Sequence, residues 1–287
     1  MGSAMGSITS TLLKSAGQYL IEEAREAITE LQTCVVPLFN ADEDGKAQLL
    51  GSAILVDVEG EIFLCTAKHV LDECKKDRSY LYIAGPTELE PLSGSFRVSN
   101  DGLDSAALKL TATQAKRFRD AQPLKADSIG NQIQAERCKY VEFMGFPATK
   151  NKRSVKRFVL KRRIQANGCT VKAITPQEVR VKFTKKRNID ATSRKRVTAP
   201  DPHGMSGGGM FGIMMTDATL KGKPKPLLIG ISTTVPNATE VYGTNIRIAM
   251  AIIRDDYGVH LSQRLDPKGL KVPTTAMSFG APEGACS

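Results

Sequence analysis

The sequence predicts an all-β fold in two halves. Most of the chain after residue 32 consists of short runs rich in β-branched and aromatic residues, which favour extended backbone. Turn-forming pairs such as Asp44-Gly45 and Glu59-Gly60 separate these runs, and this spacing is typical of a β-barrel or β-sandwich. The 287 residues are 41% hydrophobic and 24% charged, which lies in the globular range and excludes wholesale disorder.

The predicted strands form two series separated by a polar stretch. The first series occupies residues 34–39, 47–58, 61–66, 80–84, 95–98 and 106–110. Residues 113–120 form a polar linker that is compatible with a short helix. The second series occupies residues 140–144, 157–160, 169–174, 178–183, 208–214, 227–233 and 241–245. The chain is therefore expected to fold as two β halves in sequence.

Helices are predicted at both ends of the β region. Residues 10–32 repeat apolar side chains at helical spacing, with Ser10 or Thr11 as N-cap, and residues 246–254 form a closing helix. Beyond Leu265, the Pro, Gly, Ser and Thr content predicts a loose tail. We divide the chain into residues 1–32 (a cloning scar and the N-terminal helix), 33–122 (N-terminal β half), 123–262 (C-terminal β half with the closing helix) and 263–287 (the tail).

The positive charge of the chain is concentrated in one segment. Residues 150–196 contain 17 Lys and Arg against two acidic residues, a local charge of +15, so the rest of the chain carries 10 − 15 = −5. Such a segment favours binding to nucleic acid, an anionic membrane or an acidic partner. A set of solvated loops and strand faces is the favoured interpretation, because no helix-turn-helix, zinc-finger or aromatic ribonucleoprotein pattern accompanies the charge.

Three features of the composition indicate the cellular compartment and the absence of metal, cofactor and membrane-spanning segments. The six cysteines show no C-x-x-C pair and no signal-peptide pattern precedes them, so a reducing cytoplasm is expected. The three histidines lie far apart, and neither a metal site nor any other cofactor is predicted. No apolar run reaches 18 residues, so no transmembrane segment is expected.

Three segments carry potential catalytic groups beside predicted strands, in the order His69, Asp104, Ser206. They are residues 64–70 (Leu-Cys-Thr-Ala-Lys-His-Val), 104–110 (Asp-Ser-Ala-Ala-Leu-Lys-Leu) and 203–208 (His-Gly-Met-Ser-Gly-Gly). A serine hydroxyl becomes a nucleophile when a histidine takes its proton, and a carboxylate orients that histidine. Glycines beside the serine let backbone N–H groups face a developing oxyanion. Asp101 is a weaker alternative for the acid, because Asp104 directly precedes the apolar run.

These motifs resemble those of trypsin-like (chymotrypsin-fold) serine peptidases, of the disulfide-free bacterial type. Residues 66–69 (Thr-Ala-Lys-His) resemble the family's T-A-A-H, residues 104–108 resemble D-x-A-L-L, and residues 204–208 (Gly-Met-Ser-Gly-Gly) resemble G-N-S-G-G or G-D-S-G-G. Residues 51–56 match the strand that precedes the family's histidine, and residues 230–232 resemble the strand that pairs with substrate backbone. The resemblance spans residues 33 to 254.

The resemblance implies two six-stranded antiparallel Greek-key barrels with the catalytic groups in the cleft between them. His69 would act as general base and then acid, Ser206 as nucleophile through an acyl-enzyme, and Asp104 as the orienting carboxylate. The N–H groups of Gly204 and Ser206 would form the oxyanion hole. Met205 stands where the family has Asp or Asn, so activation by a new N-terminus is not expected.

The resemblance also implies a primary substrate pocket. Pro200 would form its floor, and the other candidate substrate-binding residues are Asp201, His203, Ser232, Thr233, Thr234 and Gly243. Since no acid stands at the floor or walls, small or medium apolar substrate residues are expected. A one-residue shift of the loop would bring in Asp201 and reverse this preference.

The sequence therefore predicts a serine endopeptidase that cleaves protein or peptide substrates in the cytoplasm. A catalytically silent module of the same fold, docking an acidic partner or nucleic acid through residues 150–196, is the alternative. A third hypothesis is a peptidase that needs an activator to order the loop around Met205.

Overall fold

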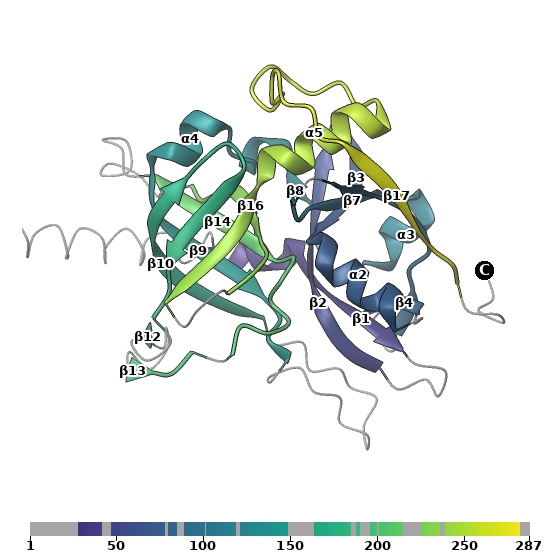
Figure 1. Ribbon diagram of the computed structural model, residues 1–287, viewed down its shortest axis with the longest axis horizontal. Coiled ribbons are helices and arrows are strands. Elements are labelled where there is room, and N and C mark those ends of the chain that lie inside the picture. Colours follow the sequence, from purple (N-terminus) through teal and green to yellow (C-terminus); the bar gives the residue numbers. More distant parts are fainter. Residues whose placement is uncertain are drawn as a thin grey trace, which may run out of the picture.

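The computed structural model describes residues 28–41, 47–77, 80–84, 89–100, 102–118, 121–148, 164–184, 188–189, 196–199, 201–214, 225–235 and 239–281. Two β structures lie side by side, with a helix across one end of both (Figure 1). The predicted all-β fold in two halves is confirmed: one half is a closed barrel and the other is a nine-stranded sheet.

The C-terminal half is a closed six-stranded antiparallel barrel. Its strands follow the order β10 (Gln165–Ile174), β11 (Glu178–Lys182), β16 (Glu240–Asn245), β15 (Leu227–Ser232), β14 (Gly209–Met214) and β9 (Cys138–Gly145), and β9 pairs with β10 to close the circle. On β11 the valines 179 and 181 are buried while Arg180 and Lys182 are exposed. This two-residue alternation is what one buried face requires.

The N-terminal half is a nine-stranded sheet and not six strands closed on themselves. Its order is β17 (Thr274–Phe279), β6 (Gly94–Ser99), β7 (Ala106–Lys109), β3 (Glu61–Thr66), β2 (Ala47–Val58), β1 (Val35–Ala41), β4 (Tyr80–Ala84) and β5 (Leu89–Pro91), with β8 (Leu124–Lys125) parallel to β2. A small separate sheet pairs β12 (Asn188–Ile189) with β13 (Arg196–Val197).

Strand β2 is buried on both faces and divides two hydrophobic cores. Ala53 and Leu55 face the core beneath α2 (Lys68–Lys76), whereas Ile54 and Val56 face the core shared with the barrel and α5 (Ile246–Tyr257). A third core fills the closed barrel. Because both faces of β2 are covered, its sequence is a nearly continuous apolar run from residue 53 to 56.

The helices are short except for α5, which lies across the top of both β structures in Figure 1. The predicted closing helix is confirmed and runs three residues further, to Tyr257, where Gly258 ends it with a left-handed backbone (φ 67°). The polar linker contains α3 (Ala112–Arg117), whose N-cap Thr111 forms a capping box with Gln114. The remaining helical elements are η1 (Gln32–Cys34), η2 (Ala126–Ser128) and α4 (Gln132–Arg137).

Some predicted elements differ or lie outside the described residues. Strands 47–58, 61–66 and 80–84 occur with the predicted bounds. The predicted strand 157–160 and most of the predicted helix 10–32 lie outside the described residues, although residues 28–31 are helical. The prediction of a loose tail at 263–287 is wrong for residues 274–279, because β17 pairs with β6 along its whole length.

Apolar contacts hold β17 on the sheet edge. Phe279 is 6% exposed, its ring meets that of Phe96 edge-on at 5.8 Å, and Lys75 Nζ lies 4.7 Å from its centroid. Polar composition alone predicts a solvated segment, but one buried aromatic side chain and a full ladder of backbone hydrogen bonds are enough to order it.

We expect Phe279→Ala to lower the free energy of unfolding by about 3 kcal/mol, because it removes a buried aromatic side chain. Ser278→Ala on the exposed face of the same strand should change it by less than about 0.5 kcal/mol. Urea titration of the two variants measures both values. Equal effects would mean that β17 is held by its backbone ladder alone.

Candidate active site

The turn that carries Ser206 is packed so tightly that side chains are excluded at Gly207 and Gly208. A Cβ at Gly207 would overlap with the carbonyl of Ser52 and the hydroxyl of Thr66, and a Cβ at Gly208 would overlap with the carbonyl of Met144. Gly207 also has a positive φ of 84°, which favours glycine. The turn therefore lies tightly between strands β2 and β3 of the N-terminal sheet and strand β9 of the barrel.

Ser52 is the residue of the N-terminal sheet that binds this turn. It is fully buried, its N–H donates to the Ser206 carbonyl (2.7 Å), and its Oγ donates to the Gly204 carbonyl (3.0 Å). The same Oγ accepts from the N–H of Phe146 in the barrel (2.9 Å). Thr66 Oγ1 in turn donates to the Ser52 carbonyl (2.7 Å). One buried serine thus joins both halves of the molecule at the candidate nucleophile.

His69 and Asp104 are brought together from different elements. His69 lies in the first turn of α2, directly after β3, and Asp104 lies in the loop before β7. His69 Nδ1 lies 2.6 Å from Asp104 Oδ2, and the His69 backbone N–H donates to Asp104 Oδ1 (2.9 Å). Both carboxylate oxygens therefore orient the same residue. Asp101, the weaker alternative, lies outside the described residues.

The Asp104 loop is anchored from two directions. Thr244 on β16 of the barrel donates its hydroxyl to the Asp104 carbonyl (3.0 Å). The buried Ser99 hydroxyl lies within hydrogen-bond distance of the Leu103 and Ser105 carbonyls, and its oxygen accepts from the Ser105 N–H (3.0 Å). The backbone that carries Asp104 is thus held in place by both halves of the structure.

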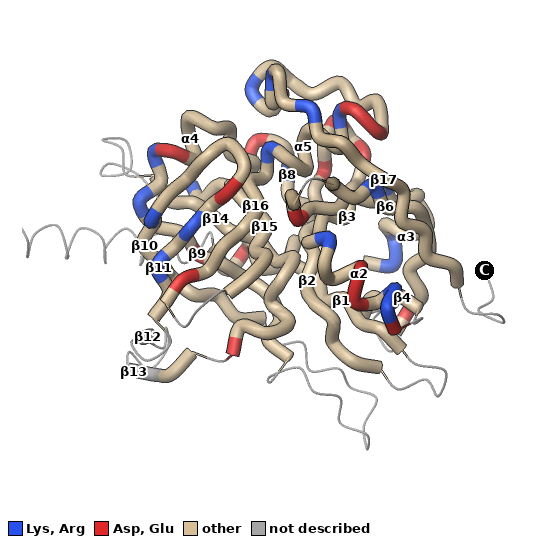
Figure 2. The backbone as a smooth tube through the Cα atoms, in the orientation of Figure 1, with Lys and Arg blue, Asp and Glu red and all other residues tan. Residues whose placement is uncertain are grey.

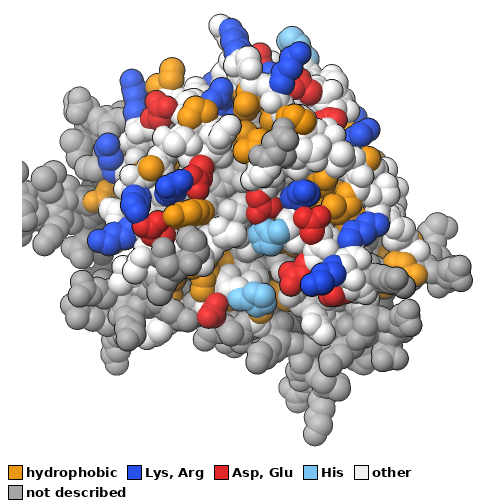
Figure 3. Space-filling model, viewed as in Figure 1, with side chains coloured by type: hydrophobic (Ala, Val, Ile, Leu, Met, Phe, Trp, Pro, Cys, Tyr) orange, Lys and Arg blue, Asp and Glu red, His pale blue; other side chains and the backbone are white. Residues whose placement is uncertain are grey.

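The surroundings of His69 raise its pKa above the ordinary value of 6.5. Partial burial is the largest single effect and lowers the pKa, but the hydrogen bond and charge of Asp104 and the charges of Glu73 and Asp72 together outweigh it. The side chains of His69 and Asp104 are 39% and 24% exposed. Histidine and acidic side chains lie exposed near the centre of the face in Figure 3.

The Ser206 hydroxyl donates to the carbonyl of Thr233 at 2.7 Å. A hydroxyl has one proton, so in this conformation the Ser206 proton points to the Thr233 carbonyl and not to His69. The helix of His69 nevertheless reaches the serine turn. A Cβ at Gly51 would lie 2.8 Å from the Val70 methyls and 2.9 Å from the Ser206 carbonyl oxygen, so both pack against this one glycine.

Two backbone N–H groups of the serine turn differ from their neighbours in hydrogen bonding. The N–H groups of Met205, Gly207 and Gly208 donate to the carbonyls of Pro202, Ser232 and Met205. Within the described part of the chain, the N–H groups of Gly204 and Ser206 have no hydrogen-bond acceptor. A pair of unpaired amides beside a serine is the arrangement that an oxyanion site needs.

The predicted substrate-binding residues differ in their exposure, and one of them lies outside the described residues. Pro200 lies outside the described residues. Asp201 is exposed, and its carboxylate accepts from the N–H of His203, which is also exposed. Gly243 is buried in the barrel wall, where a Cβ would overlap with the sulfur of Met210 and lie 2.6 Å from the Ile231 carbonyl. The sequence-based pocket preference therefore stays a prediction.

Ser232 to Thr234 are held within the protein. The Ser232 N–H donates to the Gly208 carbonyl, and the Ser232 carbonyl accepts from the Gly207 N–H, so the predicted pairing of residues 230–232 with substrate backbone stays a prediction. Thr233 N–H donates to Tyr242, and Thr234 accepts from the Tyr242 N–H. Thr234 is exposed at the surface.

Sequence reasoning missed Ser52, Thr66 and Thr244 as supporting residues. Ser52 stands in the recognised Gly-Ser-Ala run, and the signal that could have found it is a polar side chain inside an otherwise apolar strand. Thr244 carried no such signal, because its partner lies 140 residues away. Cys65 is no rival nucleophile, because burial raises the pKa of its thiol to about 12.

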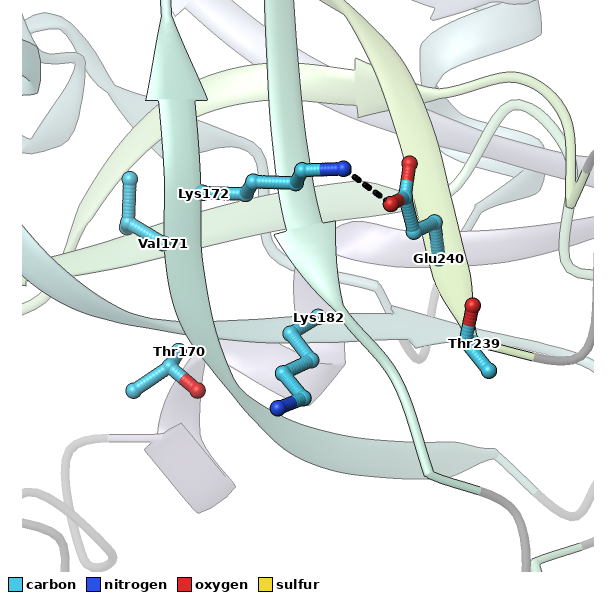
Figure 4. A pocket seen from close by; sticks show the side chains of 6 residues that line it. All are labelled: Thr170, Val171, Lys172, Lys182, Thr239 and Glu240. Carbon is cyan, nitrogen blue, oxygen red and sulfur yellow. Dashed lines mark hydrogen bonds and ion pairs between the residues drawn. The ribbon is translucent and has the colours of Figure 1, made fainter.

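A groove on the described part of the barrel surface contains none of the three candidate catalytic residues. It has a volume of about 320 Å³ and is lined by Thr170, Val171, Lys172, Lys182, Thr239 and Glu240, with Lys172 reaching across to Glu240 (Figure 4). In Figure 2, basic and acidic residues lie on neighbouring strands of this face: Lys172 on β10, Glu178, Arg180 and Lys182 on β11, and Glu240 on β16. We give this groove no catalytic role because it contains neither His69, Asp104 nor Ser206.

Two further observations concern metals and membranes. Among the described residues, no group of three or more His, Cys, Asp or Glu side chains is placed to hold a metal ion. In the same part of the chain, no helix combines the length and apolar character needed to span a bilayer.

No protein-family model and no curated protein sequence matches the chain. One solved structure, from a study titled "Aromatic interactions drive the coupled folding and binding of the intrinsically disordered Sesbania mosaic virus VPg protein", aligns with 79% of this chain and 96% of its own. The sequence identity is 12% and the TM-score 0.46. A TM-score below 0.5 gives no basis for transferring a function.

We expect Gly207→Ala to destabilise the fold by about 4 kcal/mol, the sum of a left-handed backbone and overpacking against Ser52 and Thr66. Gly60→Ala is the matched control, because Gly60 has the same backbone (φ 83°) with nothing within 4 Å of a Cβ. It should cost only about 1 to 2 kcal/mol. Equal losses in urea titrations of the two variants would show that the turn is not tightly packed in solution.

Proposed function

We propose that this protein is a serine endopeptidase of the trypsin-like type, with Ser206 as nucleophile, His69 as base and Asp104 as orienting acid. The observation that carries the proposal is that the Asp104 carboxylate binds both the ring Nδ1 and the backbone N–H of His69. A carboxylate on Nδ1 leaves Nε2 unprotonated in the neutral ring and able to accept a proton. The resemblance of the sequence motifs supports the same assignment.

The reaction proceeds in two acyl-transfer steps. Ser206 Oγ attacks the scissile carbonyl while His69 Nε2 takes the hydroxyl proton, and the N–H groups of Gly204 and Ser206 bind the oxyanion. His69 then protonates the leaving amine, which gives the acyl-enzyme and the first peptide product. Water attacks the ester with His69 again as base, and Ser206 is released with its proton restored.

Attack requires the Ser206 hydroxyl to turn from Thr233 toward His69. A neutral hydrogen bond contributes only about 1 kcal/mol net, so this rotation costs less than about tenfold in rate. The same hydrogen bond favours the second candidate function, a catalytically silent module of the same fold whose basic segment docks an acidic partner or nucleic acid. Covalent labelling separates the two functions.

We expect a fluorophosphonate probe to label the wild-type protein at Ser206, because the reagent requires an activated serine hydroxyl. Ser206→Ala should abolish labelling and lower peptide hydrolysis by more than about a thousandfold, with an unchanged thermal transition. Ser278→Ala, which removes an exposed hydroxyl on β17, serves as a control and should still be labelled at Ser206. A folded wild-type protein that resists the probe would favour the silent module.

Activity should also depend on the charge of His69. Only the neutral ring accepts a proton, so kcat/KM falls as the pH decreases through the pKa of His69, which Asp104 holds above 6.5. In Asp104→Asn the charge is lost while burial remains, so the pKa of His69 should fall and NMR titration of its ring should show the lower midpoint. A rate that is flat from about pH 5 to 9 would contradict the assignment of His69 as base.

A further inference from the structure

The two unpaired amides of the serine turn belong to peptide groups whose carbonyls are bound on the opposite side. In a trans peptide the C=O and N–H point in opposite directions, and the described backbone contains no cis peptide bond. A hydrogen bond that holds the carbonyl therefore also directs the N–H. The His203 carbonyl, which shares a peptide with the Gly204 N–H, accepts from Ala148 N–H at 2.8 Å.

The second peptide joins Met205 to Ser206, and its carbonyl has two donors. The Gly208 N–H donates to the Met205 carbonyl at 3.0 Å, and Ser232 Oγ donates to it at 2.8 Å. The Gly208 bond is internal to the turn and moves with it. The Ser232 hydroxyl comes from β15, so it is the donor that fixes this carbonyl relative to the barrel.

Every polar group of Ser232 contacts this turn. The residue is 3% exposed, its N–H donates to the Gly208 carbonyl (2.8 Å), and its carbonyl accepts from the Gly207 N–H (2.7 Å). The five residues before it on β15, Leu-Leu-Ile-Gly-Ile, are apolar. A hydroxyl buried at the end of such a strand is costly unless it is hydrogen-bonded. Two carbonyl oxygens lie within reach of the Ser232 hydroxyl, and that of Met205 (2.8 Å) is closer than that of Gly208 (3.3 Å).

We propose that Ser232 is a positioning residue, whose hydroxyl holds the Met205–Ser206 peptide with its N–H directed toward the reacting carbonyl. This inference rests on the proposed peptidase function and adds a residue that does not touch the substrate. The Ser206 N–H stabilises the oxyanion, which exists only after attack has begun. Loss of the Ser232 hydroxyl should therefore reduce kcat and leave KM nearly unchanged.

The test compares Ser232→Ala with Thr274→Val. The first removes the buried hydroxyl, and the second removes a hydroxyl that binds Asp256 on the outer strand β17. We expect kcat of Ser232→Ala to fall about tenfold with KM within about twofold, because one oxyanion donor is loosened but not lost. Thr274→Val should keep the wild-type kcat. Circular dichroism and thermal unfolding establish that both variants are folded.

A pair of peptide inhibitors adds a readout that a purely structural role would not change. A peptide aldehyde forms a hemiacetal whose oxygen occupies the oxyanion site, whereas the corresponding peptide alcohol forms none. Ser232→Ala should bind the aldehyde about tenfold more weakly and the alcohol with unchanged affinity. Ser232→Cys, which keeps a weak donor at similar volume, should recover part of the loss.

The outcomes separate this inference from the function on which it rests. If wild-type protein is labelled by fluorophosphonate and folded Ser232→Ala keeps full kcat and full aldehyde affinity, the positioning role is wrong and the peptidase stands. If both inhibitors weaken equally, Ser232 shapes substrate binding and the inference is also wrong. If wild-type protein is neither labelled nor active, both proposals fall.

Discussion

In the turn from Gly204 to Gly208, the two glycines after Ser206 have no room for a side chain, and much of the structure depends on that constraint. It lies where the N-terminal sheet, β9 and β15 meet, and side chains at Gly207 or Gly208 would overlap with backbone of both β structures. Ser52 binds this turn and Phe146 of the barrel at once. The same contacts that join the two halves therefore also position Ser206.

The electrostatics of the site follow from its place between the halves. His69 is buried enough to disfavour its charged form, yet Asp104 and the acidic residues of α2 favour that form more strongly. Asp104 is itself held by Thr244 from the barrel. A motion that separated the halves would loosen the acid and the serine turn together, so the site depends on the interface being intact.

Polar residues at the periphery serve mainly local structure. Lys172 and Arg180 on the outer face of the barrel pair with Glu240 and Glu178. These pairs are exposed to solvent and contribute little to stability. They also neutralise part of the charge that the sequence concentrates in residues 150–196, which agrees with a solvated face for the described part of that segment.

The sequence by itself determined the strands and the order of the chemical groups, because both are written in local patterns. Alternation or continuity of apolar residues located strands such as 47–58 and 61–66, and three short motifs singled out His69, Asp104 and Ser206. Only the tertiary structure decided which groups meet. The Asp104 carbonyl and Thr244 are 140 residues apart, and Ser52 and the Gly204 carbonyl are 152 apart. Long-range contacts also placed β17 in the sheet and the Ser232 hydroxyl against the Met205 carbonyl. Such contacts depend on strand register and packing between distant segments, which local composition does not encode.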